Sequence, residues 1–275
     1  MTTTLPSIAI IGAGAMGGAI LNGLLGPGVS VASIRVTNRG QAKAAVLERP
    51  GVESLAIETT PDANRRAVAG ARLVVIGVKP AMVPDALAEI ADALDPDALV
   101  ISVAAGVTTA TMEGIVSTSV LRAMPNTPAL IGRAVTGLAG GSRATGDDLA
   151  IGRALFETVG TVVELPESQI DALSTISGSG PAYVFYLIEE LTRTAVDMGF
   201  SADIASLLVE GTFAGSIELL TASAKTPAEL RRQVTSPKGT TERAIAELER
   251  ADLKAIFDRA TGAALARARE LAAGG

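Results

Sequence analysis

The chain has 275 residues, 48% of them hydrophobic, and a formal net charge of −6, with a mean hydropathy of +0.40. This composition excludes a disordered chain and predicts a globular protein with a large core and apolar surface buried between subunits. The acidic balance argues against a nucleic-acid partner. Cysteine and histidine are both absent, which excludes disulfides, thiolate nucleophiles and the commonest metal ligands. We therefore expect no metal, and chemistry that relies on carboxylates, Lys, Tyr, Ser and Thr.

Apolar segments such as 73–78 are much shorter than the roughly 20 residues that span a bilayer, and no positively charged targeting segment opens the sequence. We expect no membrane partner and a cytoplasmic location.

Short apolar segments rich in β-branched residues alternate with alanine-rich helical segments in the first part of the chain. This alternation predicts a parallel sheet covered by helices on both faces. The predicted strands are 7–11, 33–37, 73–78, 99–103 and 119–123, and two further β-like segments that extend the sheet are 134–139 and 161–164.

After residue 165 the apolar residues recur at helical spacing and no strand-like alternation is present. The predicted helices are 181–198, 202–222, 227–234 and 251–272. The sequence thus predicts an α/β fold with two domains, a doubly wound sheet over 1–164 and an all-helical domain over 165–275.

A glycine-rich motif, Gly12-Ala13-Gly14-Ala15-Met16-Gly17, directly follows the first predicted strand and opens a helix. In this context the first glycine allows a tight turn, the second lets a pyrophosphate approach the backbone, and the third permits close helix–strand packing. The motif predicts a Rossmann-type dinucleotide site.

The end of the second predicted strand indicates which dinucleotide is preferred. NAD-binding sites place an acid there against the ribose 2′-hydroxyl, but this chain has Asn38 and Arg39, and its first acidic residue is Glu48. Asn38 and Arg39 donate hydrogen bonds and Arg39 adds positive charge, which suits a 2′-phosphate. NADPH is favoured, with NADH as a weaker cofactor; the alternative is that Arg39 is only a solvated surface residue.

Five irregular segments remain, at 78–80, 104–106, 124–128, 177–183 and 234–241. The first three follow predicted strands, so they lie at the edge of the sheet where α/β proteins bind ligands. The last is rich in Ser, Thr and Gly and leads into a helix, which suits a substrate carboxylate. An ordinary helix cap is the alternative for this segment.

Taken together, these motifs resemble the pyrroline-5-carboxylate reductase family along nearly the whole chain. The resemblance implies a Rossmann domain followed by an all-helical substrate and dimerisation domain. The helical domain interleaves with its copy in an obligate homodimer, and each active site is completed at the dimer interface. Whether dimers assemble into larger oligomers is not implied. The motifs that carry it are Gly12-Ala13-Gly14-x-Met16-Gly17, Val78-Lys79-Pro80, Ala104-Ala105-Gly106, Met124-Pro125-Asn126-Thr127-Pro128, Gly178-Ser179-Gly180-Pro181-Ala182-Tyr183 and Ser236-Pro237-x-Gly239-Thr240-Thr241.

The same resemblance implies which residues bind each molecule. Glu167 matches a substrate-side acid of some members, although an exposed loop glutamate is an equal alternative. Lys238 departs from the family, which has a second glycine there, and a lysine is costly if the loop needs positive φ. The other substrate residues are Ser236, Gly239, Thr240 and Thr241. The cofactor residues, with Gly17 and Arg39 from the motif analysis, are Ile11, Gly12, Ala13, Gly14, Ala15, Met16, Asn38, Asn64, Val78, Lys79, Pro80, Val103, Ala104 and Ala105.

The implied reaction is the last step of proline biosynthesis, in which NADPH reduces the C=N bond of 1-pyrroline-5-carboxylate to L-proline. A protonated imine is already electrophilic, so the protein must orient rather than abstract a proton. Thr241 is the catalytic candidate, its hydroxyl hydrogen-bonding the ring nitrogen.

Two other functions remain as alternatives. A β-hydroxyacid dehydrogenase shares this plan, but it relies on a lysine early in the helical domain, and residues 165–224 contain none. A non-catalytic NADP-binding redox sensor would not need the ordered substrate segments.

Overall fold

The computed structural model describes residues 3–272. Its contacts divide the chain into two compact units. The α/β unit comprises the described residues up to Ser179 and those from Ala264 onward, and the helical unit is Gly180–Ala263. The boundary expected after residue 164 stays a prediction; the turns that follow it pack on β9 of the α/β unit.

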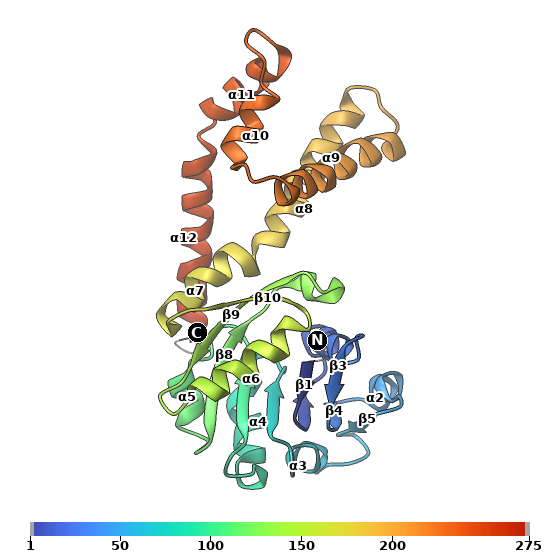
Figure 1. Cartoon of the computed structure of the whole chain (residues 1–275), viewed down its shortest axis with the longest axis vertical. Helices are drawn as coiled ribbons and strands as arrows, with labels where there is room; N and C mark the ends of the chain where they lie inside the picture. The colour runs from blue at the N-terminus through green and yellow to red at the C-terminus, as the bar shows by residue number, and fades with distance from the viewer. Residues whose placement is uncertain (1–2, 273–275) are drawn as a thin grey trace. The chain divides into compact units, whose positions relative to one another are not determined.

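The α/β unit is built on an eight-stranded sheet (Figure 1). All neighbouring strands are parallel except β8 and β9, which are antiparallel, so β9 and β10 run against the other six. A separate parallel pair is formed by β1 (Thr3–Leu5) and β3 (Val29–Val31). In spatial order the eight strands are β10 (Gly160–Glu164), β9 (Ala134–Gly140), β8 (Ser119–Met124), β7 (Leu99–Ser102), β6 (Leu73–Ile76), β2 (Ile8–Ile11), β4 (Ile34–Asn38) and β5 (Val52–Ala56).

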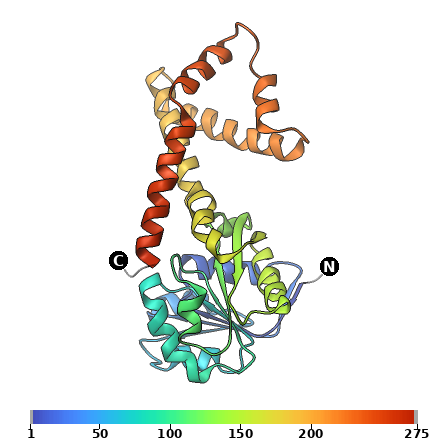
Figure 2. The same ribbon diagram turned by 90° about the vertical axis from the view of Figure 1, so that its left-hand side faces the viewer.

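Helices cover both faces of this sheet, as the sequence predicted (Figure 2). Short 3₁₀ turns, η1 to η4, lie at Pro80–Met82, Ala91–Ala93, Thr127–Ile131 and Glu167–Gln169, and a π-helical turn, η5, lies at Ser174–Gly178. The helices are α1 (Ala15–Leu24), α2 (Gln41–Leu47), α3 (Ala63–Val68), α4 (Val83–Ile90), α5 (Thr109–Glu113), α6 (Gly146–Glu157) and α7 (Ile170–Leu173).

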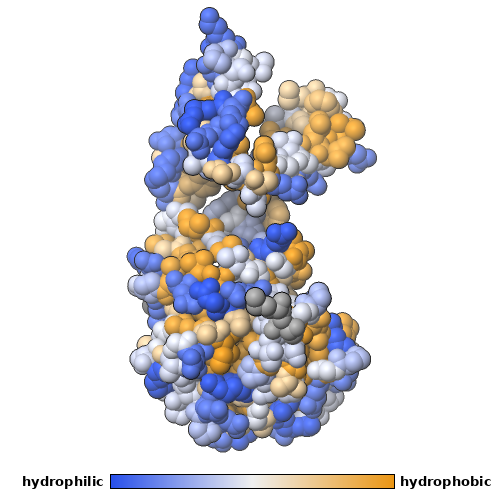
Figure 3. All heavy atoms as spheres, in the orientation of Figure 1, coloured by the Kyte–Doolittle hydropathy of each residue, from blue (hydrophilic) through white to orange (hydrophobic). Residues whose placement is uncertain are grey.

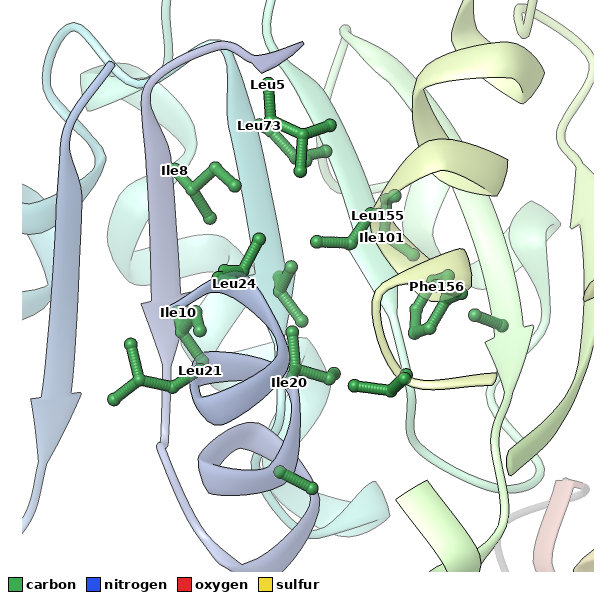
Figure 4. Close-up of a cluster of buried hydrophobic side chains, with 14 of the residues drawn as sticks. Leu5, Ile8, Ile10, Ile20, Leu21, Leu24, Leu73, Ile101, Leu155 and Phe156 are labelled. Atoms are coloured by element: carbon green, nitrogen blue, oxygen red, sulfur yellow. The ribbon is translucent and has the colours of Figure 1, made fainter. Parts of the chain in front are cut away.

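Two apolar layers form the core because successive side chains of a strand point to opposite faces. Ile8 and Ile10 of β2 join the layer under α1 and α6, whereas Ala9 and Ile11 join the layer under α3, α4 and α5. Figure 4 shows the first layer, with Phe156 of α6 beside the strands. Strands buried on both faces explain why the sequence shows continuous apolar segments there.

The helical unit contains α8 (Gly180–Asp197), α9 (Ala202–Ala222), α10 (Pro227–Gln233), α11 (Thr240–Arg250) and the first part of α12 (Leu253–Ala272). Helices α8 and α9 pack together, yet Ala205 and Val209 are the only buried hydrophobic residues of this unit. Large apolar side chains are exposed instead, including Phe185 at 65% and Leu207 at 69%. Figure 3 shows apolar residues gathered on the surface over α8 and α9.

Helix α9 is long and apolar enough to cross a membrane by length and composition alone. The sequence analysis missed this because Glu210 and Glu218 interrupt its apolar residues. Only 11% of its most apolar window is buried.

Gly160, the first residue of β10, provides a test of the sheet. Its φ is +153°, and a Cβ atom there would lie 2.2 Å from the carbonyl oxygen of Ala134. Gly160→Ala should therefore lower the free energy of unfolding by about 2–3 kcal/mol, measured by urea denaturation. Gly146→Ala is the control, since its Cβ would enter open space; equal stability of the two variants would contradict this packing.

Candidate active site

The chain reverses its direction across the sheet at β2. From β2 it continues to β4 and β5 on one side, and then returns to β6, β7 and β8 on the other. The loops after β2 and β6 therefore leave a crevice at the carboxyl ends of the strands, which is where open α/β sheets bind ligands.

Two glycines allow the loops at this crevice to touch. Gly12 has φ +80°, and a Cβ there would lie 2.6 Å from Cγ1 of Val78. A Cβ on Gly77 would lie 2.8 Å from the carbonyl oxygen of Gly12. Gly17 lets α1 approach β2, because its Cβ would lie 3.2 Å from Cγ2 of Ile10. The three close approaches account for glycine at these positions.

The N-terminus of α1 faces this crevice with its backbone uncovered. Gly14 is the N-cap and makes no side-chain cap, and the first turn carries no acidic residue. The first N–H groups of a helix have no intrahelical acceptor and attract anions. This is the arrangement that the glycine motif predicted for a pyrophosphate.

A pocket of about 360 Å³ lies over these loops. Eight of the predicted cofactor residues line it: Ile11, Gly12, Gly14, Asn38, Arg39, Asn64, Val78 and Lys79. The rest of its wall could not be predicted from the sequence, because those residues come from a helix face and strand ends without a motif. They are Thr37, Ile57, Gly77, Met82, Asp85, Ala86 and Glu89.

The other predicted cofactor residues lie outside this lining. Ala13 is buried at 1% exposure, and its N–H donates to the carbonyl of Thr37. The remainder are Ala15, Met16 and Gly17 in the first turn of α1, Pro80 at the start of η1, and Val103, Ala104 and Ala105 directly after β7.

Two buried amide side chains in the pocket wall each leave one atom without a hydrogen bond among the described residues. Asn38 is 5% exposed and its Nδ2 has no partner, and Asn64 is 4% exposed and its Oδ1 has none. The Nδ2 of Asn64 donates to Glu89 at 2.8 Å. Buried polar atoms are almost always paired, so this unpaired donor and acceptor fit a polar ligand with hydroxyl groups, such as a ribose.

Arg39 is exposed at the same wall and makes no ion pair within the described chain. A guanidinium with free donors suits bidentate binding of a phosphate.

Asn126 joins the loop after β8 to the π-helical turn η5. Its Nδ2 donates to the carbonyl of Ser177 at 2.9 Å, and its Oδ1 accepts from the N–H of Val135 at 2.9 Å. The hydroxyl of Ser177 is buried without a partner in the described structure. Single π turns are frequent at functional sites, but no residue of this turn lines the dinucleotide pocket.

Glu167 is engaged within the α/β unit. Its carboxylate accepts from the N–H and the hydroxyl of Thr109 at 2.7 and 2.6 Å and lies 3.6 Å from the guanidinium of Arg122. Arg122 is 3% exposed and also pairs with Asp171. These contacts give Glu167 a structural role in holding η4 and α7. The residues around it in the sequence do not predict this role.

The other predicted substrate residues, Ser236, Gly239, Thr240 and Thr241, lie together in the loop after α10 and the first turn of α11. Gly239 is the N-cap of α11, and its N–H donates to the carbonyl of Ser236 at 3.0 Å. Thr240 and Thr241 open the helix, so uncapped backbone N–H groups and two hydroxyls are presented at one point. Thr241 is half-buried, whereas Ser236 and Thr240 are exposed.

Lys238 has φ 62°, in the left-handed region that favours glycine. A lysine adopts this conformation here at a cost of about 1–2 kcal/mol. Its N–H donates to the carboxylate of Glu242 at 2.9 Å, which stabilises the turn.

Comparisons with known proteins give a family match in each half of the chain. Residues 167–271 match the family described as pyrroline-5-carboxylate reductase dimerisation, and residues 7–106 match the family described as NADP oxidoreductase, coenzyme F420-dependent. A pyrroline-5-carboxylate reductase of Pseudomonas aeruginosa is 38% identical, with 97% of each chain covered.

Solved structures give the same relationship. That of a pyrroline-5-carboxylate reductase from Coxiella burnetii is 35% identical, with a TM-score of 0.88 over 96% of this chain and 98% of its own. A pyrroline carboxylate reductase of Plasmodium falciparum, solved with NADP bound, shares the fold at 24% identity, with a TM-score of 0.83 over 97% and 98% of the two chains. The chain therefore belongs to the pyrroline-5-carboxylate reductase family.

Proposed function

We propose that the chain reduces 1-pyrroline-5-carboxylate to L-proline with NADPH, the last step of proline biosynthesis. The observation that carries the proposal is the dinucleotide pocket at the switch point of the sheet, with the buried Asn38 and Asn64 each leaving an atom unpaired, in a chain of this family.

The α/β unit holds the cofactor in this proposal. The uncapped N-terminus of α1 binds the pyrophosphate, Asn38 and Asn64 bind the adenosine ribose, and Arg39 binds the 2′-phosphate. When bound, NADPH supplies the hydride that is added to the C=N carbon. Loops after β6 and β7, with Val78 to Pro80 and Val103 to Ala105, position the nicotinamide end at the edge of the sheet.

The loop before α11 holds the substrate. Backbone N–H groups from Gly239 to Thr241, with the hydroxyls of Ser236 and Thr240, bind the carboxylate. The hydroxyl of Thr241 hydrogen-bonds the ring nitrogen and fixes the face of the C=N bond. The imine reacts in its protonated form, so orientation is the main demand on the protein. A chain without histidine can meet that demand.

We infer that the helical units of two chains cover each other's apolar faces in a homodimer. This homodimer is either the final assembly or the unit of a larger homo-oligomer. The exposed side chains of α8 and α9, Phe185 and Leu207 among them, support this because faces of this kind are seldom left to solvent. The cytoplasmic location stays a prediction.

The proposed reaction is tested by following NADPH oxidation with 1-pyrroline-5-carboxylate, alongside NADH and a six-membered cyclic imine. We expect turnover of the five-membered imine, faster with NADPH. Binding of NADPH without turnover of any imine would favour a redox sensor instead.

Thr241→Ala should lower kcat by about 10–100-fold while leaving NADPH affinity almost intact, because the lost hydroxyl orients the substrate and does not contact the cofactor. Thr241→Ser, which keeps the hydroxyl, is the control and should retain most of the activity. The measurements are steady-state kinetics and NADPH binding by fluorescence titration. Equal loss of both quantities, or of neither, would count against the role.

Arg39→Asp should shift the cofactor preference toward NADH, since it replaces a positive charge at the ribose by one that repels a 2′-phosphate. Arg49→Asp is the control, because Arg49 contacts Asn22 and does not line the pocket. The ratio of kcat/KM for NADPH and NADH measures the shift. An unchanged ratio in Arg39→Asp would reject the 2′-phosphate role.

A further inference from the structure

Glu58 is brought to the end of β4 by a strand that the sequence analysis did not predict. Beyond β5 the backbone continues beside β4, with the N–H of Ile57 donating to the carbonyl of Asn38 at 2.9 Å and the N–H of Glu58 donating to that of Arg39 at 3.1 Å. Glu58 is thus fixed beside two residues that line the dinucleotide pocket.

The carboxylate of Glu58 covers the turn after Arg39. Its Oε2 accepts the N–H of Gln41 at 3.1 Å, and both carboxylate oxygens lie 3.6 Å from the position that a Cβ of Gly40 would take. The neighbouring Thr59 donates to Oε1 of Gln41 at 3.0 Å. A negative charge is therefore held against the backbone of Gly40 and Gln41.

This turn is where the two nicotinamide cofactors differ. In Rossmann-type sites the end of the second strand faces the adenosine ribose, where an acid binds the 2′-hydroxyl of NAD and an arginine accommodates the 2′-phosphate of NADP. The end of β4 carries no acid, which led the sequence analysis to favour NADPH. Glu58, in the turn after β5, places a carboxylate against the residues that follow the end of β4.

We infer that Glu58 is a specificity-determining residue that weakens binding of the 2′-phosphate and so narrows the preference for NADPH over NADH. Its charge repels the phosphate, and its Oε2 is held near the cofactor pocket by the N–H of Gln41. Arg39 acts in the opposite direction, and the balance of these two charges sets the preference. The inference rests on the proposed cofactor site.

The Glu58→Gln variant separates charge from structure. A glutamine keeps an acceptor for the N–H of Gln41 and nearly the same volume but removes the negative charge. If Glu58 only caps the turn, the substitution changes stability and leaves ligand preference alone. If it discriminates between ligands, the preference changes while the thermal unfolding temperature remains close to that of the parent.

The experiment is isothermal titration calorimetry of the full chain with 2′,5′-ADP and with 5′-AMP, two ligands that differ in the 2′-phosphate and permit no catalysis. Glu58→Gln should bind 2′,5′-ADP about tenfold more tightly at low salt, with 5′-AMP changed by less than about twofold. The gain should shrink at about 0.5 M salt because charges are then screened. Glu53→Gln is the matched control, since Glu53 lies on β5 and pairs with Arg35 and Arg66.

The titrations distinguish failure of this inference from failure of the proposed cofactor site. If Glu58→Gln leaves the ratio of the two affinities unchanged, or if Glu53→Gln shifts it equally, the inference is overturned and the cofactor site stands. If neither ligand binds the parent chain, the proposed cofactor site is wrong and the inference falls with it.

Discussion

The cofactor pocket depends on the contact between the loops that end β2 and β6. Gly12 and Val78 meet there at a distance that leaves no room for a side chain on residue 12, and Gly77 presses on the carbonyl of Gly12 from the other side. The same contact turns the backbone so that α1 begins with its N–H groups exposed to the crevice. Hydrogen bonds to a ligand are stronger in a protein crevice than in water, because the local dielectric constant is lower. The polar residues of the wall, Asn38 at the end of β4 and Asn64 on α3, line the same pocket as this contact.

Much of the α/β unit follows from its sequence, because its central strands are buried on both faces and appear as continuous apolar segments. The strands that were not predicted lack this signature. β5 reads Val-Glu-Ser-Leu-Ala, with its ends buried and its middle partly exposed at the margin of the sheet. The reversed direction of β9 could not be predicted either, since an apolar strand has the same pattern in both directions.

The residues of the candidate site also fall into those that the sequence predicts and those that it does not. The glycine loop could be located from sequence because each glycine meets a steric demand that no other residue satisfies. Glu58, Glu89 and the Asn126–Ser177 hydrogen bond could not, since each depends on elements far apart in the chain. The contacts of Glu167 with Thr109 and Arg122 likewise depend on the fold, and its contact with the substrate stays a prediction.

The pairing of Arg122 with Glu167 and Asp171 bears on how this chain can be divided. A fragment that ended at residue 164 would retain a guanidinium that is 3% exposed and would lose both of its counter-charges, a cost of about 3–5 kcal/mol. It would also remove Ile170, which is fully buried. An autonomous nucleotide-binding fragment for crystallisation or biosensor design must therefore extend beyond Asp171. The compact α/β unit itself includes the residues up to Ser179 and the described residues from Ala264 onward.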